Sequence, residues 1–357
     1  MKIALIVPGN LWFSPYVSIY TNALDKLHIN YEVISWNRDG SDKPYGIQYK
    51  STKQPVGAFA KLKEYIRYIS FVKNTVKKYN FDKLIVFSSQ LSILICYFLK
   101  RQYKNNYILD YRDLSIEQKN YLMPFFRIVL NNSFANIISS PGFKKHLPPH
   151  NKYIISHNFN IDLVQQSISA SANEYRDSEC IDILTIGGIR DYQSNIEVVN
   201  ALANKPQYRM HFVGKGIAAP LIEKYVHNNR IHNVFFEGYY PKEKEGEYIN
   251  KCSFLNIFYP KVKTHATAIS NRFYNALVYK KPMIVTSSST QGYYVEKYNL
   301  GLAINDCNDL DKTIENWLNQ YNHTQFCKSC NKLLSIFIND YKIFIETLNN
   351  FIAENNK

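Results

Sequence analysis

The sequence lacks any hydrophobic run long enough to cross a lipid bilayer. Its most apolar segment, residues 84–99, is interrupted by polar residues at 88–90, and it is shorter than the roughly 20 residues that a spanning helix needs. The apolar run at residues 2–7 is short and ends at Pro8 and Gly9, so it does not have the shape of a signal peptide. We therefore expect neither a transmembrane segment nor a secretory signal.

Cysteine is also sparse, and the six cysteines are scattered at positions 96, 180, 252, 307, 327 and 330. This is not a disulfide framework, so a reducing compartment is expected. Only Cys327 and Cys330 are closely spaced; His323 is near them, but zinc would need a fourth ligand, which the surrounding sequence does not offer. Asp309 and Asp311 precede a helical pattern and are better explained as helix capping. No metal site is predicted.

Acidic residues are scarce in the first part of the chain. Residues 1–150 contain 21 Lys and Arg against 9 Asp and Glu, a net charge of +12, whereas residues 151–357 contain 22 against 20, a net charge of +2. A basic field confined to one half indicates an anionic partner there: nucleic acid, a membrane surface or a phosphate-bearing substrate. The basic and apolar segment 61–81 is typical either of a helix on an anionic membrane or of a helix with one buried face and solvated lysines.

What the sequence does contain is a repeated alternation of short apolar runs and helical patterns. A length of 357 residues exceeds one typical core, so we expect two domains. Each has the pattern of an α/β domain with a doubly wound parallel sheet. The predicted domains are 1–165 and 176–331, joined by a linker at 163–179, and an amphipathic helix over 332–357 closes the fold.

Several loops that follow predicted strands are candidate binding sites, because ligands of open α/β sheets bind at the carboxyl ends of the strands. Gly9 follows the first strand and would let a ligand approach the backbone. Gly188, after Gly187 and before Arg190, suits a phosphate, although a surface turn with a solvated arginine has the same pattern. Lys215 stands between two glycines and is either a phosphate contact or an exposed lysine in a turn.

Two more strand ends carry charged side chains. Arg272 lies in the first turns of a predicted helix, where free N–H groups and a cation favour an anion. Asp110, Arg112 and Asp113 follow another strand, and this group suits either hydroxyl binding and proton transfer or a structural ion pair.

The order of motifs in the second half resembles the carboxyl-terminal half of GT-B glycosyltransferases, specifically the family-4-like (GT4-like) enzymes. The series is ILTIGGIR, HFVGKG, NVFFEGYY, SFLNIFY, SNRFYNALVYKKPMIVT and YNLGLAI. The stretch from Ser270 to Pro282 aligns without gaps to the family's S-N-K-L-F-E-Y-M-A-A-G-K-P. The resemblance implies a GT-B fold: two Rossmann-like domains facing a central cleft, with a closing helix. In the first half only YRDL looks like a related segment.

The resemblance also implies roles for individual residues. Arg190 and Arg272 fall on the positions that contact the donor diphosphate. Asn275 falls on the glutamate that usually holds the ribose hydroxyls, and Asn271 would help to orient the nucleotide. Gly238 and Tyr239 fall where the chain usually runs past the nucleobase, and Gly9, Gly188 and Lys215 are further candidate donor contacts.

Three positions depart from the family pattern. Asn275 replaces a glutamate, Asn195 replaces a lysine and Lys280 replaces a glycine. The loss of one cation and one carboxylate affects the affinity for the donor and its identity, but not the fold. Arg272 would replace the missing lysine as a cation that contacts the donor.

The resulting prediction is a retaining, metal-independent hexosyltransferase without cofactor. It would move a sugar from a UDP- or GDP-linked donor to a lipid-linked glycan bound near Asp113. The context expected by analogy is capsule, lipopolysaccharide or exopolysaccharide synthesis. The protein would be cytoplasmic and peripheral on the inner face of the cell membrane, without nucleic acid as a partner. Two alternatives stay open: a nucleotide-sugar epimerase on the same fold, and a non-catalytic polyanion-binding protein.

Overall fold

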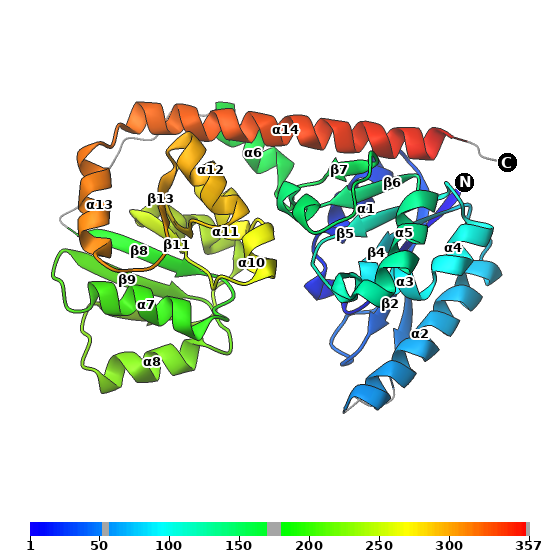
Figure 1. The fold of residues 1–357 in the computed structure, drawn as a ribbon, viewed down its shortest axis with the longest axis horizontal. Helices are drawn as coiled ribbons and strands as arrows, with labels where there is room; N and C mark the ends of the chain where they lie inside the picture. Colours follow the sequence, from blue (N-terminus) through cyan, green and yellow to red (C-terminus); the bar gives the residue numbers. More distant parts are fainter. Residues whose placement is uncertain (52–56, 170–179, 355–357) are drawn as a thin grey trace. The chain divides into compact units, whose positions relative to one another are not determined.

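The computed structural model describes residues 1–51, 57–169 and 180–354. The chain divides into two units (Figure 1): unit 1 comprises Met1–Asn158 and Asp340–Lys357, and unit 2 comprises Phe159–Asn339. Each unit is a parallel sheet covered by helices, as the alternating sequence pattern predicts.

Unit 1 contains a seven-stranded parallel sheet in the order β3-β2-β1-β4-β5-β6-β7. Its strands are β1 (Lys2–Ile6), β2 (Asn30–Asn37), β3 (Ile47–Lys50), β4 (Lys83–Phe87), β5 (Tyr107–Tyr111), β6 (Ala135–Ile138) and β7 (Tyr153–Ile155). Its helices before the crossover are α1 (Val17–Lys26), α2 (Ala58–Lys78), α3 (Ser89–Leu94), α4 (Cys96–Gln102) and α5 (Met123–Asn132), with short 3₁₀ turns at Leu11–Phe13, Ile116–Gln118, Asn120–Leu122 and Pro141–Lys145. Strands β4 and β5 are buried along their whole length, which explains their nearly continuous apolar sequence.

Unit 2 contains a six-stranded parallel sheet in the order β10-β9-β8-β11-β12-β13. Its strands are β8 (Ile181–Ile186), β9 (Tyr208–Val213), β10 (Val234–Glu237), β11 (Phe254–Ile257), β12 (Met283–Thr286) and β13 (Gly301–Ile304). Its helices are α6 (Ile161–Ser169), α7 (Tyr192–Leu202), α8 (Ala219–Asn228), α9 (Glu245–Lys251), α10 (Lys263–Thr267), α11 (Asn271–Val278), α12 (Thr290–Tyr298) and α13 (Leu310–Asn319), with a 3₁₀ turn at Lys242–Lys244.

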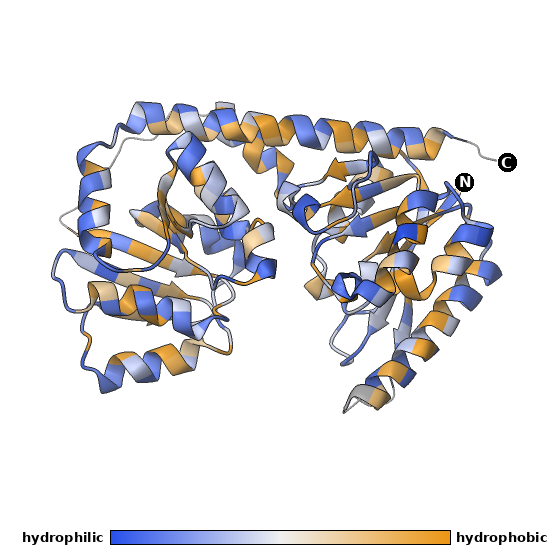
Figure 2. Cartoon of the chain, viewed as in Figure 1, coloured by the Kyte–Doolittle hydropathy of each residue, from blue (hydrophilic) through white to orange (hydrophobic). Residues whose placement is uncertain are grey.

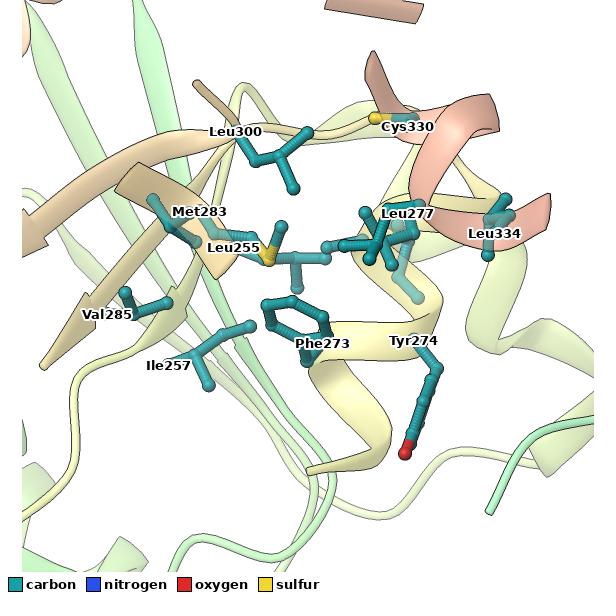
Figure 3. Close-up of a cluster of buried hydrophobic side chains, with 14 of the residues drawn as sticks. Leu255, Ile257, Phe273, Tyr274, Leu277, Met283, Val285, Leu300, Cys330 and Leu334 are labelled. Atoms are coloured by element: carbon teal, nitrogen blue, oxygen red, sulfur yellow. The ribbon is translucent and has the colours of Figure 1, made fainter. Parts of the chain in front are cut away.

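The sheet of unit 2 has a hydrophobic core on each face. Successive residues of a strand point to opposite faces, and in β12 Met283 and Val285 join one core whereas Ile284 joins the other. Figure 3 shows the first core, where Phe273 and Leu277 of α11 pack against the side chains of β11 and β12. This packing fixes α11, and therefore the residues at its start, against the carboxyl ends of these strands.

Helix α14 (His323–Ala353) begins in unit 2 and ends in unit 1. It starts earlier than the closing helix that the sequence predicted over 332–357, because the side chain of Asn322 accepts a hydrogen bond from the backbone N–H of Gln325 (2.9 Å) and caps the helix. In unit 1 its Phe344, Leu348 and Phe351 are buried in the core beside β1.

The linker predicted over 163–179 is wrong in its first part. Residues 161–169 form α6, whose amino end is capped by the side chain of Asn160 on the N–H groups of Asp162 (3.0 Å) and Leu163 (3.3 Å). Val164 is fully buried, so the helix packs on unit 2 although its sequence is mostly polar. Residues 170–179 lie outside the described residues.

Helix α2 has the buried face that one of the two alternatives requires, and it also exposes large apolar side chains. Tyr68, Val72 and Val76 form a buried face, whereas Phe59 and Ile66 are 82% and 59% exposed. Figure 2 shows hydrophobic and hydrophilic residues alternating along this helix. Within the described part of the chain, no helix is both long and apolar enough to cross a membrane.

Candidate functional site in unit 2

The strand order of unit 2 changes direction between β8 and β11. From β8 the sheet continues through β9 and β10, and from β11 it continues through β12 and β13. Loops on the two sides of such a switch point diverge, and ligands of open α/β sheets bind there, outside the carboxyl ends of the strands. Most of the sequence-predicted site residues follow these strands.

Arg272 joins the two strands at the switch point. Its Nε donates to the carbonyl of Ile186, at the end of β8 (2.5 Å), and its Nη1 donates to the carbonyl of Asn256 in β11 (3.3 Å). Its Nη2 donates to the carbonyl of Gly188 in the following loop (3.1 Å). The side chain is only 8% exposed, and its guanidinium lies 5.7 Å from the centre of the Tyr259 ring. Arg272 therefore links the ends of β8 and β11 to the glycine loop, residues 187–190, which follows β8. Its positive charge lies next to this loop.

Packing requires glycine in the loop after β9 but not in the loop after β10. A Cβ atom at Gly214, where φ is +130°, would lie 2.1 Å from the carbonyl oxygen of Gly187, and one at Gly216 would lie 2.0 Å from that of Ile189. These two glycines allow the loops after β8 and β9 to pack against each other. Gly238 has no such reason, because a Cβ atom there would meet nothing within 4 Å and its φ is not positive.

Arg190 and Lys215 are the exposed cations of these two loops. The backbone N–H of Ile189 donates to the carbonyl of Lys215 (3.1 Å), so the two loops that carry these cations are neighbours. In the described part of the chain Arg190 has no hydrogen-bond or ion-pair partner, and the Nζ of Lys215 lies 5.6 Å from the centre of the Tyr239 ring. Tyr239 itself is 76% exposed. Two cations and a solvent-facing aromatic ring thus lie on adjacent loops.

Asn275 contacts a carboxylate that the sequence did not reveal. Its Nδ2 donates to Oε2 of Glu245, the first residue of α9 (3.0 Å). Tyr240 donates from its hydroxyl to Oε1 of Glu245 (2.8 Å), and Lys242 donates to Oε2. Burial, with this hydrogen bond adding to it, raises the pKa of Tyr240 well above its ordinary value. Glu245 stands in the charged run KEKEGE, which is typical of a solvated surface, so no sequence signal separates it from its neighbours.

The start of α11 is well ordered by capping. Ser270 accepts at its side chain from the N–H of Phe273 (3.4 Å) and donates from its own N–H and hydroxyl to Oε1 of Gln291 (3.0 and 2.8 Å). Asn271 is the first helical residue and is exposed, one helical turn before Asn275.

Asn195, which stands where the family has a lysine, belongs to the core. It is 5% exposed, its Nδ2 donates to the carbonyl of Asp191, and its Oδ1 accepts from Nδ2 of Asn256 (3.3 Å). A lysine ammonium at this place would be buried without a carboxylate among these partners, which explains why an amide fits here.

Two predicted residues, Asp113 and Gly9, belong to unit 1. Asp113 follows β5 and is exposed. Desolvation by the surrounding protein raises the pKa of its carboxyl, and the positive charge of Arg112 opposes this shift. Its neighbours form the structural ion pair that the sequence left as one alternative: Arg112 donates twice to the fully buried Asp110 (2.6 and 2.7 Å).

Gly9 lies beside the side chain of Arg38, whose Nη2 donates to the carbonyl of Pro8 and to the hydroxyl of Tyr65 (both 2.6 Å). A Cβ atom at Gly9 would lie 3.7 Å from Nε of Arg38, an ordinary contact, so packing does not require glycine there.

The closely spaced cysteines lie inside α14. Cys327 and Cys330 are buried free thiols, and burial raises the pKa of both. Among the described residues, no three His, Cys, Asp or Glu side chains are grouped as a metal site would need.

In comparisons by sequence, no protein-family model and no curated protein matches this chain. Among solved structures, it is similar to the sucrose-phosphate synthase of Thermosynechococcus elongatus, with a TM-score of 0.69, 16% identity and 99% of each chain covered. It is similar to the apo form of the lipopolysaccharide outer core galactosyltransferase WaaB, with a TM-score of 0.66, 13% identity and 99% of each chain covered. It is also similar to Anabaena HepE in complex with UDP and glucose, with a TM-score of 0.66, 13% identity, and 98% of this chain and 100% of that chain covered.

These likenesses extend over both units and establish the fold. The chain has the GT-B fold, with two Rossmann-like units and a long carboxyl-terminal helix, as the sequence predicted.

Proposed function

We propose that the protein is a retaining glycosyltransferase that moves a hexose from a nucleotide diphosphate sugar to a lipid-linked glycan. The observation that carries the proposal is the neighbourhood of Arg190 and Lys215 on adjacent loops at the switch point of a GT-B unit. Exposed cations on glycine-containing loops suit a diphosphate group. The similar structure of HepE was obtained with UDP and glucose bound to that protein, which supports a nucleotide sugar as the donor.

In this proposal each part of the donor has its own contacts. Arg190 and Lys215 neutralise the diphosphate as it leaves, work that a divalent ion does in other enzymes, so that no metal is needed. The buried Arg272 adds its positive charge next to the same loop, and its N–H groups that do not bond carbonyls can donate to the diphosphate. Tyr239 offers its exposed ring to the nucleobase above the open backbone of Gly238. Gly188 lets the diphosphate approach the backbone.

The ribose would lie near the start of α11. Asn271 and Asn275 orient the nucleotide, and Glu245, held by Asn275 and Tyr240, supplies the carboxylate that position 275 lacks. A carboxylate accepts hydrogen bonds from hydroxyl groups more strongly than an amide oxygen does, so this arrangement restores the charge of the family's glutamate.

Thermal unfolding with a panel of UDP- and GDP-linked sugars tests the donor. We expect one nucleotide sugar to raise the unfolding temperature, and the stabilisation at 100 times Kd should be about 2.7 kcal/mol. Arg190→Met should lose most of this stabilisation.

Nuclear magnetic resonance of the products distinguishes transfer from epimerisation. Transfer needs an acceptor and keeps the anomeric configuration, and it should proceed with a chelator present. An epimer formed from the donor alone would identify an isomerase, and salt-sensitive binding of nucleic acid without any nucleotide-sugar effect would identify a polyanion-binding protein.

The acceptor is proposed to bind unit 1 near Asp113, with the protein peripheral on the cytoplasmic face of a membrane where capsule, lipopolysaccharide or exopolysaccharide is made. The support is the charge of +12 on residues 1–150 and the exposed residues of α2, where Phe59, Leu62 and Ile66 alternate with exposed Lys61 and Lys63.

Sedimentation with vesicles tests the membrane contact. We expect retention on vesicles containing phosphatidylglycerol at low salt and release at high salt. Replacing Phe59 and Ile66 by serine should weaken binding by about tenfold or more, because each buried apolar side chain contributes about 1.5–3 kcal/mol. Serine at the exposed Ile217 of unit 2 is the matched control. Equal retention of both variants would refute the role of α2.

A further inference from the structure

Unit 1 contains a cavity of about 790 Å³ beside the carboxyl ends of β1 and β2. Its walls come from the loop that follows β1, the start of α1 and the loop that follows β2. This volume lies within the range of about 300–1,000 Å³ that small-molecule sites occupy. Of the candidate site residues, only Gly9 lies on one of these loops, and it is not among the residues that line the cavity.

An exposed tryptophan forms one wall of the cavity. Trp12 is 57% exposed, and its Nε1 donates to Oγ of Ser41 (2.8 Å), so the orientation of the indole is fixed by the opposite loop. Phe13 stacks on it with 3.4 Å between the ring centres. A flat aromatic surface held in place, with its polar atom already bonded, suits the apolar C–H face of a ring-shaped ligand.

Two of the three charged side chains that line the cavity are carboxylates, which accept hydrogen bonds. Asp42 accepts from the N–H of Leu11 through Oδ2 (2.9 Å), and its Oδ1 has no partner among the described residues. Asp39 accepts from Ser41 and Asn10, and these bonds, the Ser41 hydroxyl first, hold the pKa of its carboxyl below the usual value. Lys43 is the one basic side chain among the residues that line the cavity.

The charge of the cavity therefore differs from that of its surroundings. Residues 1–150 carry +12, yet the lining has two carboxylates and one ammonium. Carboxylates repel a phosphate and accept hydrogen bonds from hydroxyl groups. The combination of a fixed aromatic wall with carboxylate acceptors selects an uncharged, hydroxyl-rich ring.

We propose that this cavity binds a neutral sugar ring, which, resting on the proposed transferase function, is a sugar unit of the acceptor glycan. Ser14 lines the cavity and accepts from the hydroxyl of Tyr16 (3.1 Å), and the Arg112 guanidinium lies 5.0 Å from the centre of the Tyr16 ring. Tyr16 thus contacts both a residue that lines the cavity and Arg112, the residue before Asp113. The exposed face of α2, which is proposed above to contact a membrane, and the sugar-binding cavity would then serve different parts of one acceptor.

Fluorine resonance of the protein labelled with 5-fluorotryptophan tests the proposal. The chain has three tryptophans, so three resonances are expected. The resonance that is missing in Trp12→Phe belongs to the cavity, and the buried Trp36, 2% exposed, serves as an internal reference. The probes are the methyl glycosides of glucose, galactose, mannose and N-acetylglucosamine. We expect at least one of them to shift the Trp12 resonance with saturation, while the other two resonances stay in place.

Asp42→Asn provides the second measurement, because asparagine retains an oxygen for the N–H of Leu11 but loses the charge. It should weaken sugar binding about tenfold, while Tyr121→Ser, which alters an exposed aromatic of unit 1 outside the cavity lining, should leave it unchanged. The proposal is overturned if none of the four glycosides shifts the Trp12 resonance, if glucose 6-phosphate binds more tightly than methyl glucoside, or if Asp42→Asn binds as the wild type does.

A parallel titration with UDP and GDP sugars keeps the two proposals separate. Sugar binding at Trp12 without any nucleotide-sugar binding would remove the transferase and keep the cavity as a glycan site. Nucleotide-sugar binding and transfer with an unresponsive Trp12 would remove the cavity assignment and keep the transferase.

Discussion

The buried arginine at the switch point gives a prediction that separates a structural role from a donor-binding role. In Arg272→Met the side chain keeps much of its volume and loses all three hydrogen bonds to the carbonyls of Ile186, Asn256 and Gly188. The corresponding change at the exposed Arg190, Arg190→Met, removes a cation that has no partner in the described part of the chain. The two variants alter the same charge in two environments.

The expected loss of stability follows from the three bonds. A hydrogen bond to a charged donor contributes about 1.5–3 kcal/mol, and a buried acceptor left without a donor costs about 1–3 kcal/mol. Two features reduce the sum: the bond to Asn256 is long, at 3.3 Å, and Gly188 is exposed to water. Removing the desolvation cost of a buried cation offsets a further part. We expect Arg272→Met to lose about 3 kcal/mol, or about 6–12 °C in the unfolding temperature of a unit of this size, and Arg190→Met to stay within about 0.5 kcal/mol of the wild type.

Calorimetric unfolding and titration with the preferred nucleotide diphosphate measure the two effects. Arg190→Met should weaken nucleotide binding about tenfold or more, the loss of one charge-assisted contact. Arg272→Lys is the informative intermediate, because lysine keeps the charge but cannot reach three carbonyls with a planar fork. It should bind the nucleotide better than Arg272→Met while remaining destabilised. If Arg272→Met unfolds at the wild-type temperature, the links that Arg272 makes have no energetic meaning and the reasoning is refuted.

Three further outcomes follow from single contacts. Gly214→Ala should destabilise the protein by more than 2 kcal/mol because of its φ of +130° and the clash at 2.1 Å, whereas Gly238→Ala, with open space around it, should unfold normally and bind the nucleotide less tightly. Lys83→Met should cost about 2 kcal/mol in urea unfolding, because the buried Lys83 ammonium donates to the carbonyl of Phe351, in the last turn of α14, and to that of Glu354, just after the helix (2.5 Å). Burial lowers the pKa of His157, despite its bond to Asp340, so the folded state favours the neutral ring. This contribution to stability is therefore complete above a pH of about 6.5, and below that pH it falls by up to about 1.4 kcal/mol per pH unit. Urea unfolding from pH 7.5 to 5.5 should show a smaller loss of stability in His157→Gln than in the wild type.

The fold could be predicted because its signal is local and repeated. Strands that are buried on both faces are read as short apolar runs, and β1, β4 and β5 all have that pattern. The short strand β3 (Ile47–Lys50) was missed because no residue of it is buried, so its sequence carries no such run. The apolar segment 84–99 contains β4, α3 and the start of α4, and the two helices are separated at Ile95, where the backbone leaves the helical region.

The site was predicted less completely, because some of its contacts have no side-chain signature. The sequence placed Arg272 in the first turns of a helix, but its hydrogen bonds to the backbone carbonyls of Ile186 and Gly188, which lie 86 and 84 residues earlier, depend on tertiary structure alone. In the same way, the sequence showed Gly214 and Gly216 only as the two glycines that flank Lys215, and the structure explains them by the close approach of two loops. Arg190 and Lys215 are exposed on loops that follow strands, and their contact with a donor stays a prediction.

Asn275 and Glu245 form a pair whose members should be exchangeable. A glutamate at 275 would lie beside Glu245, and two carboxylates about 4 Å apart repel each other by about 4 kcal/mol in a partly screened environment. Asn275→Glu alone should therefore be destabilised and bind nucleotide poorly, and Glu245→Gln alone should bind about tenfold more weakly for lack of a carboxylate.

The double variant Asn275→Glu with Glu245→Gln again has one carboxylate and one amide at 3 Å. We expect it to recover most of the stability and nucleotide affinity that each single change removes, so the coupling free energy of the double-mutant cycle should exceed 1 kcal/mol. Glu243→Gln, which changes an exposed acid of the same charged run, is the control and should have no effect. Additive losses in the double variant would show that the two positions act independently, and the carboxylate of Glu245 would then have no part in holding the ribose.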